Sequence, residues 1–430
     1  MPDTLDAWLA KLEKRHHSAI DLGLDRCRAV WENLGMPRPA DCVFTIAGTN
    51  GKGSTVAYLD HVLRSCGKTS ARYTSPHLLS FTERIVINGA EVSPKELVKA
   101  FEHVEAHLDG VSLSYFEFTT LAAFVLMARS TLDCAVLEVG LGGRLDAVNL
   151  VDPDCAVITP IGLDHQEYLG DNIEQIGYEK AGIMRGGIPV VCGDRNPPAS
   201  LAARAKELGA EWLQLGHEIA HHDGGGSRRL RVRNSELPFP PPPLPGDHQL
   251  DNFATSLAAI ETVFPGLLHN GDWVPGLGKF LLPGRLSTVA ANPAIVIDVG
   301  HNPLAAEVLA GHIQAHLRPR VHCVLGMLRD KDAGQIARIL SASVFRWYCA
   351  GLPGPRGRSG RELVHTLRNS VPGIMAAPHG TVGAALDSAL DNAGSSDTVI
   401  VFGSFETAAR AMAHLGIEPG ELAASQAPIS

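Results

Sequence analysis

Short runs of β-branched and apolar residues alternate with amphipathic stretches along most of this chain, beginning at Val43. Apolar runs bounded by turn residues are typical of buried strands, and apolar residues at helical spacing are typical of helices. Their alternation predicts parallel strands covered by helices on both faces. In the first part of the chain the predicted strands are residues 43–48, 134–139, 155–160 and 188–193, and the predicted helices are residues 55–66, 116–128 and 250–263.

A second alternation of the same kind occupies the last third of the chain. Its predicted strands are residues 294–299, 321–326, 344–350 and 398–402. Leu282-Pro283-Gly284 separates the two alternations, because proline and glycine interrupt regular elements. The sequence therefore predicts an α/β fold with a first domain of residues 1–283 and a smaller α/β domain of residues 284–430.

The region of about residues 211–245 differs in composition from the rest of the first domain. It contains three consecutive glycines at 224–226 and six prolines between Pro238 and Pro245. Proline lacks a backbone donor and fixes φ, so this run cannot form a helix or a central strand. We predict a small β-excursion here, followed by a linker.

The strongest local pattern is the passage from strand 43–48 into a glycine-rich loop with one lysine. The loop reads Gly48-Thr49-Asn50-Gly51-Lys52-Gly53-Ser54-Thr55. Backbone N–H groups at such a helix start bind polyphosphate, and a following hydroxyl can bind magnesium. The loop differs from the common G-x-x-x-x-G-K-[ST] pattern, because Ile46 stands at its first glycine. An ordinary turn is the alternative, but the order strand, loop, helix favours ATP.

Polar residues follow three further predicted elements. Glu138 lies near the end of strand 134–139, His165 follows strand 155–160, and Lys180 lies on a short helix that ends at Gly182. Ligands bind at the carboxyl edge of open α/β sheets, and magnesium prefers oxygen ligands. The alternatives remain open: a paired structural carboxylate, a structural histidine, and an ordinary lysine near a helix C-terminus.

The second domain begins with a similar arrangement. Strand 294–299 runs into a polar turn with Asp298 and His301, and Arg285 lies just upstream. Both domains thus have polar groups where a strand meets its loop. We expect ATP on the first domain to react with groups held by the second.

Composition excludes several classes of protein. The 430 residues are 45% hydrophobic and 19% charged, with a net charge of -9, which argues against a nucleic-acid partner. No basic leader precedes an apolar core at the N-terminus, and no apolar window is long enough to span a bilayer. The eight cysteines have no paired C-x-x-C spacing. We therefore expect a cytoplasmic protein with reduced thiols and no membrane partner.

Together, these motifs closely resemble the folylpolyglutamate synthase and dihydrofolate synthase family, which is related to the ATP-dependent Mur ligases. The resemblance extends from Leu22 to Phe405. Besides the glycine-rich loop, it rests on Thr74-Ser75-Pro76-His77-Leu78, the run from Glu138 to Asp146, Leu163-Asp164-His165, Glu179-Lys180-Ala181-Gly182 and the run from Asp298 to Pro303.

The resemblance implies a P-loop-type parallel sheet domain with flanking helices and a smaller Rossmann-like glutamate-ligase domain. It also implies an ADP-forming ligase that joins L-glutamate to dihydropteroate and to reduced folates through an acyl phosphate. Expected cofactors are ATP, magnesium at two sites and a carbamate on Lys180 formed from CO2. The expected partners are these small molecules, and the expected state is a monomer.

The resemblance further implies residue roles. ATP would be bound by the loop from Gly48 to Thr55 and by Asn252, Arg285 and Asp298. Metal ligands would be Ser54, Ser75, Glu138, His165 and Lys180 as its carbamate. Lys52, Lys180, His165 and His301 would be catalytic, and Ser114, Phe116, Asp146 and Ala147 would hold the pterin.

Three alternatives stay open: a monofunctional folylpolyglutamate synthase, another Mur-type ligase, and a nucleotide-dependent regulatory module. Only 47 residues precede the glycine-rich loop, whereas Mur ligases have a separate amino-terminal domain for their nucleotide-sugar substrate. We therefore expect folate rather than a peptidoglycan precursor. A regulatory module would leave Lys180, His165 and the second domain unexplained.

Overall fold

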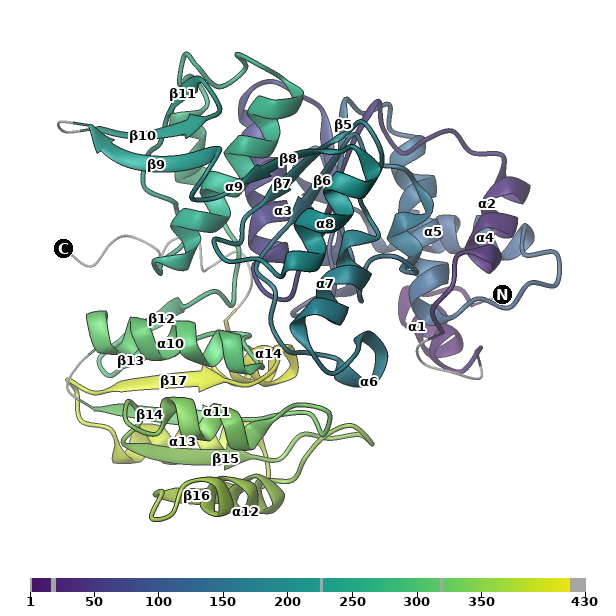
Figure 1. Cartoon of the computed structure of the whole chain (residues 1–430). Coiled ribbons are helices and arrows are strands. Elements are labelled where there is room, and N and C mark those ends of the chain that lie inside the picture. Colours follow the sequence, from purple (N-terminus) through teal and green to yellow (C-terminus); the bar gives the residue numbers. More distant parts are fainter. Residues whose placement is uncertain (1, 17–20, 225–226, 318–319, 418–430) are drawn as a thin grey trace. The chain divides into compact units, whose positions relative to one another are not determined.

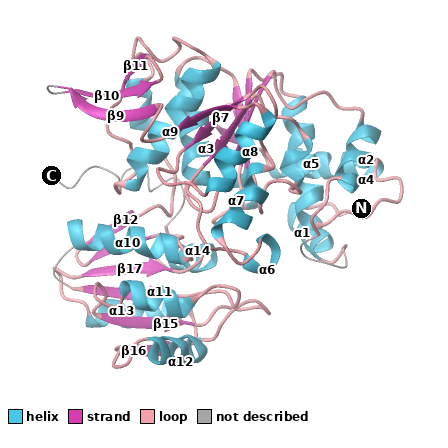
Figure 2. Cartoon of the chain, viewed as in Figure 1, coloured by secondary structure: helices cyan, strands magenta, loops and turns pink. Residues whose placement is uncertain are grey.

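A computed structural model describes residues 2–16, 21–224, 227–317 and 320–417 (Figure 1). The chain forms two compact units. The first unit consists of Met1–Ile161, Gln166–Pro241 and Leu250–Gly278, and the second consists of Gly162–His165, Pro242–Gln249 and Lys279–Ser430. Each unit contains a mainly parallel sheet with helices packed against it, which confirms the predicted α/β class (Figure 2).

The first unit is built on an eight-stranded sheet in the order β4-β3-β2-β5-β1-β6-β7-β8. Six strands, from β2 to β8 in that order, pair in parallel, whereas β3 and β4 pair antiparallel at one edge. Strand β1, in the interior of this sheet, is buried at every position, as expected for a parallel strand covered on both faces. The strands are β1 (Cys42–Ala47), β2 (Ser70–Tyr73), β3 (Ile85–Ile87), β4 (Ala90–Glu91), β5 (Cys134–Glu138), β6 (Cys155–Ile158), β7 (Pro189–Cys192) and β8 (Glu211–Gln214).

Helices of the first unit differ in how deeply they are buried. Helices α3 and α5 are buried on nearly all sides, and α3 contacts β1, β2 and β5. The helices are α1 (Leu5–Glu13), α2 (Asp25–Leu34), α3 (Lys52–Ser65), α4 (Pro94–Ala106), α5 (Tyr115–Ala128), α6 (Gln166–Leu169), α7 (Ile173–Ala181) and α8 (Ala199–Leu208), together with α9 (His248–Val263), whose first two residues are grouped with the second unit. No described helix is both long enough and apolar enough to cross a bilayer.

The predicted β-excursion is a separate three-stranded antiparallel sheet in the order β11-β10-β9, made of β9 (Ile219–Gly224), β10 (Ser227–Val232) and β11 (Ser235–Pro238). Its predicted start at residue 211 is wrong, because Glu211–Gln214 forms β8 at the edge of the large sheet. The predicted strand 155–160 is also too long. Pro160 cannot donate to the ladder, and its carbonyl instead accepts the backbone N–H of Thr49 at 2.9 Å.

The second unit has a six-stranded sheet in the order β12-β13-β17-β14-β15-β16, in which only β12 is antiparallel to its neighbour. Helices α10, α11 and α12 lie on one face, and α13 and α14 lie on the other (Figure 1). This is the expected Rossmann-like arrangement. The elements are β12 (Ser287–Ala291), β13 (Ala294–Ile297), α10 (Pro303–His316), β14 (Val321–Leu325), α11 (Ala333–Leu340), β15 (Arg346–Ala350), α12 (Gly360–Ser370), β16 (Ala376–His379), α13 (Val382–Asn392), β17 (Thr398–Phe402) and α14 (Phe405–His414).

Candidate active site

The glycine-rich loop connects β1 to α3, as the sequence predicts. Gly51 caps the start of α3 with φ +86°, a conformation that glycine adopts without strain. The Lys52 ammonium turns back over the loop and donates to the carbonyls of Gly48 at 3.0 Å and Thr49 at 3.1 Å. Backbone N–H groups at a helix start and one lysine therefore occupy the same loop, which is the composition of a phosphate-binding site.

Two glycines of this loop lie against side chains from other elements. A Cβ at Gly48 would collide with the Thr159 side chain, and one at Gly51 would lie 2.5 Å from Oδ1 of Asn252. A larger residue at position 48 would therefore also meet the Thr159 backbone, and one at position 51 would displace the Asn252 side chain. The second contact places Asn252, which is expected to bind ATP, directly beside the loop.

Lys180 lies near the end of α7 with only 5% of its surface exposed. Its Nζ donates to the Gly48 carbonyl at 2.8 Å, across 132 residues of sequence. A Cβ at Gly143 would lie 3.1 Å from Lys180 Cα and closer still to the carbonyl oxygens of Glu179 and Lys180. Two segments thus contact Lys180: the glycine-rich loop, called the phosphate loop below, and the glycine run Gly140-Leu141-Gly142-Gly143 after β5. An ordinary surface lysine at a helix end would not have these contacts.

Glu138 and Ser75 also meet in the first unit. Glu138 ends β5, its side chain is buried, and its Oε2 accepts the backbone N–H of Ser75 at 3.2 Å. Ser54, in the first turn of α3, is buried as well. Hydroxyl and carboxylate oxygens are the ligands that magnesium prefers, so these donors suit a divalent cation. Within the described ranges, no three His, Cys, Asp or Glu side chains form a metal-binding group by themselves.

The four residues expected to hold a pterin lie around the glycine run after β5. Ser114 caps α5 through a capping box with Glu117, and a Cβ at Gly140 would lie 2.5 Å from the Phe116 ring. Asp146 accepts the backbone N–H groups of Leu141 at 2.8 Å and Val148 at 2.9 Å. Ala147 follows it and is buried. Phe116 and Asp146 are therefore held by consecutive residues of one loop.

Burial sets the charge of Asp146. Loss of solvent around its carboxyl group raises the pKa to about 6, although backbone hydrogen bonds and the Lys180 charge act in the opposite direction. The group is charged at neutral pH and protonated in mild acid. It can accept hydrogen bonds from ring N–H and amino groups in the charged form.

The sequence pattern did not reveal Arg26, which fixes the start of α5. Its guanidinium donates to Glu117 Oε1 at 3.1 and 2.8 Å, and Glu117 Oε2 accepts the Ser114 backbone N–H at 2.7 Å. Arg26 also pairs with Asp21 at 3.0 Å. The turn that presents Ser114 and Phe116 is thereby bound to α2.

In the second unit the predicted polar turn after β13 forms as expected. Asp298 accepts the backbone N–H groups of Leu286 at 3.0 Å and Gly300 at 2.7 Å. The Arg285 guanidinium lies 5.4 Å from the centre of the Phe405 ring. His301 Nδ1 lies 2.9 Å from the Val299 carbonyl oxygen, which fixes the orientation of the imidazole.

His165 belongs to the segment Gly162–His165, which packs with the second unit. The neighbouring Asp164 pairs with the Lys331 ammonium at 2.5 Å and accepts from Asn302 at 3.1 Å. Lys331 Nζ also lies 3.4 Å from His165 Nε2. The charges of Lys331, His165 and His301 hold the pKa of Asp164 well below its usual range, against the opposing effect of burial.

Lys331 was not among the predicted site residues, although its position in the sequence gives one signal. The lysine follows the predicted strand 321–326 in the polar stretch Arg329-Asp330-Lys331-Asp332. Like Glu138 and Asp298, Lys331 is a polar residue near the end of a predicted buried strand, where ligands bind in open α/β sheets.

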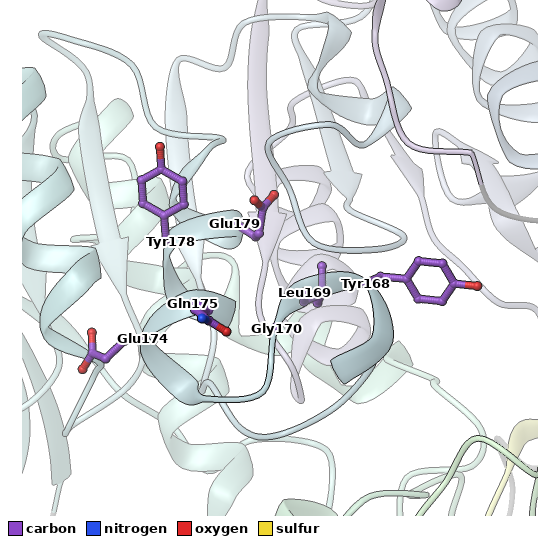
Figure 3. A pocket seen from close by; sticks show the side chains of 7 residues that line it. All are labelled: Tyr168, Leu169, Gly170, Glu174, Gln175, Tyr178 and Glu179. Carbon is purple, nitrogen blue, oxygen red and sulfur yellow. The ribbon is translucent and has the colours of Figure 1, made fainter.

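A pocket opens between residues of α6 and α7 (Figure 3). Helix α7 also carries Lys180. Its polar side chains already have partners: Glu174 accepts the backbone N–H groups of Ala199 and Ser200, and Glu179 pairs with Arg144 at 2.9 Å. The rings of Tyr168 and Tyr178 point in different directions. These contacts hold α7 in place. The lining residues are Tyr168, Leu169, Gly170, Glu174, Gln175, Tyr178 and Glu179.

Two protein families match this chain. Residues 46–260 match the family described as the Mur ligase middle domain, and residues 284–405 match the Mur ligase glutamate ligase domain. The chain thus contains both of these Mur ligase domains.

Individual relatives identify the family of this chain within the Mur ligase class. The chain is 41% identical to the dihydrofolate synthase/folylpolyglutamate synthase of Escherichia coli, over 95% of this chain and 94% of the relative. The Haemophilus influenzae protein of the same name is 38% identical, over 94% of this chain and 96% of the relative. The chain therefore belongs to the dihydrofolate synthase/folylpolyglutamate synthase family.

Solved structures of this family have the same fold as this chain. The structure of E. coli FolC in complex with DHPP and ADP has a TM-score of 0.91 and 39% identity, covering 97% of this chain and 99% of that one. A bifunctional folylpolyglutamate synthase/dihydrofolate synthase with Mn, AMPPNP and L-glutamate bound has a TM-score of 0.88 and 40% identity, covering 96% and 98%.

Proposed function

We propose that this chain is an ADP-forming ligase that adds L-glutamate to dihydropteroate and to reduced folates. The substrate carboxylate attacks the γ-phosphorus of ATP, ADP leaves, and an acyl phosphate forms. The glutamate amine then attacks the acyl carbon, phosphate leaves, and the nitrogen loses a proton. The observation that supports this most strongly is the buried Lys180, bound to the Gly48 carbonyl of the phosphate loop.

The phosphate loop binds and orients the nucleotide. Backbone N–H groups at the start of α3 would bind the polyphosphate, and Lys52 would supply a positive charge that stabilises the transferring phosphoryl group. Lys52 is already held at the loop by two carbonyls. Asn252, whose Oδ1 lies against Gly51, would add to the nucleotide site of the first unit. Arg285 and Asp298 are further proposed ligands of ATP.

Divalent cations would be held by Ser54, Ser75, Glu138, His165 and Lys180. When bound, they screen the negative charges of the carboxylate and the phosphates from each other. Lysine is a cation and a poor ligand for magnesium. We therefore propose that the Lys180 amine reacts with CO2, loses a proton and becomes an anionic carbamate, which supplies oxygen ligands.

The acceptor is held by the loop after β5. Its pterin would stack on Phe116, with Asp146 accepting hydrogen bonds from the ring and Ser114 and Ala147 beside them. His301 and Asp298 would act from the second unit on glutamate and ATP. The enzyme would be a monomer in the cytoplasm, where its eight free cysteines stay reduced.

The second candidate is a monofunctional folylpolyglutamate synthase. A relative with that name, from Lacticaseibacillus casei, is 33% identical over 78% of this chain. The 41% identity to the bifunctional E. coli protein over 95% of the chain favours both activities.

The test measures ADP formation with magnesium, ATP and glutamate, with either dihydropteroate or tetrahydrofolate as acceptor, and identifies the product by mass spectrometry. We expect a mass increase of one glutamate on each acceptor. Lys180→Ala should lower turnover by about a hundredfold or more, because it removes the proposed carbamate. Nucleotide binding should be kept, because Lys52 still donates to the Gly48 and Thr49 carbonyls after the contact of Lys180 with Gly48 is lost. Failure with dihydropteroate alone would select the monofunctional enzyme. Failure with both acceptors, or full turnover in Lys180→Ala, would contradict the proposal.

A further inference from the structure

The small sheet β9–β11 has no part in the site described so far. It nevertheless packs on α9, the helix that presents Asn252 to the phosphate loop. The contact involves a charged cluster and a series of aromatic rings, all within the first unit. Both originate outside α9 and reach its first turns.

The charged cluster centres on Arg195, which follows β7. Its Nη2 donates to Asp251 Oδ1 at 2.6 Å and its Nε donates to Asp251 Oδ2 at 3.0 Å, so the pair is bidentate. The same Nη2 lies 3.0 Å from Nε2 of His221 on β9. One guanidinium thus joins the large sheet, the small sheet and the first turn of α9.

The aromatic series begins at the same histidine. The His221 ring lies 5.3 Å from that of Phe239, which stacks on Phe253 of α9 at 5.7 Å and 22°. Phe253 in turn lies 5.0 Å from Tyr58 of α3. The small sheet is therefore fixed against both α9 and the helix that begins at the phosphate loop.

Asn252 lies between these two sets of contacts in the sequence. It directly follows Asp251 and precedes Phe253, and its Oδ1 lies against Gly51. One turn later, the Ser256 hydroxyl donates to the Thr55 carbonyl at 3.2 Å. A small rotation of the first turn of α9 would move Asn252 relative to the phosphate loop.

We propose that Arg195 is a positioning residue for the nucleotide: with His221 of the small sheet, it holds Asp251 and thereby keeps Asn252 against Gly51. This inference rests on the proposed function, because it takes Asn252 to contact ATP. It gives the β-excursion a role in nucleotide affinity.

The exposure of the Arg195–Asp251 ion pair distinguishes a role in positioning Asn252 from a role in stabilising the fold. The side chains of Arg195 and Asp251 are 46% and 29% exposed, and ion pairs that are this accessible add little to the free energy of unfolding. Loss of the pair should therefore leave the protein folded. Its effect should instead appear in the geometry of the helix turn that it orients.

The experiment compares Arg195→Ala, Arg195→Lys and Asp251→Asn with the wild type. Arg204→Ala is the matched control, because Arg204 forms a similar exposed pair with Glu207 at 2.6 Å on the neighbouring helix α8. The measurements are the dissociation constant for ADP by calorimetry, the KM values for ATP, glutamate and dihydropteroate, kcat, and the melting temperature.

We expect Arg195→Ala to raise the ADP dissociation constant and the KM for ATP roughly tenfold, the size of one charged hydrogen bond. The KM for glutamate, the kcat at saturating ATP and the melting temperature should match the control. Arg195→Lys should recover part of the affinity, and Asp251→Asn should resemble Arg195→Ala.

The proposal is overturned if nucleotide affinity in Arg195→Ala stays within twofold of the control, or if all KM values rise together. It is also overturned if kcat falls while the KM for ATP stays constant. ADP binding is measured without turnover, so a wild type that binds ADP but makes no folate product contradicts the proposed function and leaves the effect of Arg195 measurable.

Discussion

Asp146 is the residue whose ionisation should be visible in the kinetics. Burial raises its pKa to about 6 while Lys180 carries its positive charge, so the carboxyl is charged above that pH and neutral below it. The carbamate proposed on Lys180 would replace that positive charge with a negative one and raise the pKa further. We predict that the KM for dihydropteroate rises by up to about tenfold for each pH unit below the pKa, since protonation removes the negative charge and turns one acceptor oxygen into a donor. Asp146→Asn should raise this KM and abolish its pH dependence. An identical pH profile in the variant would exclude Asp146 as the titrating group.

A residue's own sequence neighbourhood decides how well its role can be predicted. Gly48, Glu138 and Asp298 stand where apolar runs end, so a local pattern was sufficient to select them. Lys331 also follows an apolar run, so its position can be selected in the same way, but its pairing with Asp164, 167 residues away, cannot. Arg195 depends on Asp251, 56 residues away, and a single sequence contains no signal that joins such a pair. The roles of Lys180 and His165 came from the resemblance, and the structure adds the contact between Lys180 and Gly48.

The start of helix α5 depends on a charge from another helix. The Glu117 side chain is 4% exposed and pairs with Arg26 of α2, which is 30% exposed. We predict that Arg26→Ala lowers the free energy of unfolding by about 2 kcal/mol, because it leaves a buried carboxylate with one partner fewer. Adding Glu117→Gln should restore part of the loss. Urea denaturation measures both changes.

The control for this prediction lies on the same helix. Arg28 pairs with Asp25 at 3.4 Å on an exposed face, so Arg28→Ala should change stability by less than about 0.5 kcal/mol. Equal destabilisation by Arg26→Ala and Arg28→Ala would show that the buried carboxylate is not the cause.

Elements were predictable where they were apolar and regular. Residues 398–402 were predicted as a strand and form β17, because they are a continuous buried run. Residues 211–214 do not stand out as a strand of the large sheet, because β8 is a half-exposed edge strand and lacks a continuous apolar run. The sequence therefore places them in the excursion. Helices α1 and α2 were not predicted, since no strand alternates with them.

The two units of the whole molecule are interleaved in the sequence. Gly162–His165 and Pro242–Gln249 pack with the second unit, although residues of the first unit flank them on both sides. The proline and glycine at residues 283–284 predict a single boundary there, whereas the last segment of the second unit begins at Lys279. Such a local interruption gives no signal for two short segments within the first alternation. Asp164 shows the physical reason, because its ion pair with Lys331 exists only in the folded chain.

The proposed reaction depends on activation of the acceptor carboxylate by ATP as an acyl phosphate. The decisive experiment labels both carboxylate oxygens of dihydropteroate with oxygen-18 and analyses the released phosphate by mass spectrometry. We expect one oxygen-18 atom in each phosphate, because the carboxylate oxygen that attacks the γ-phosphorus departs with it when glutamate adds. Unlabelled phosphate alongside labelled dihydrofolate would contradict the proposed reaction.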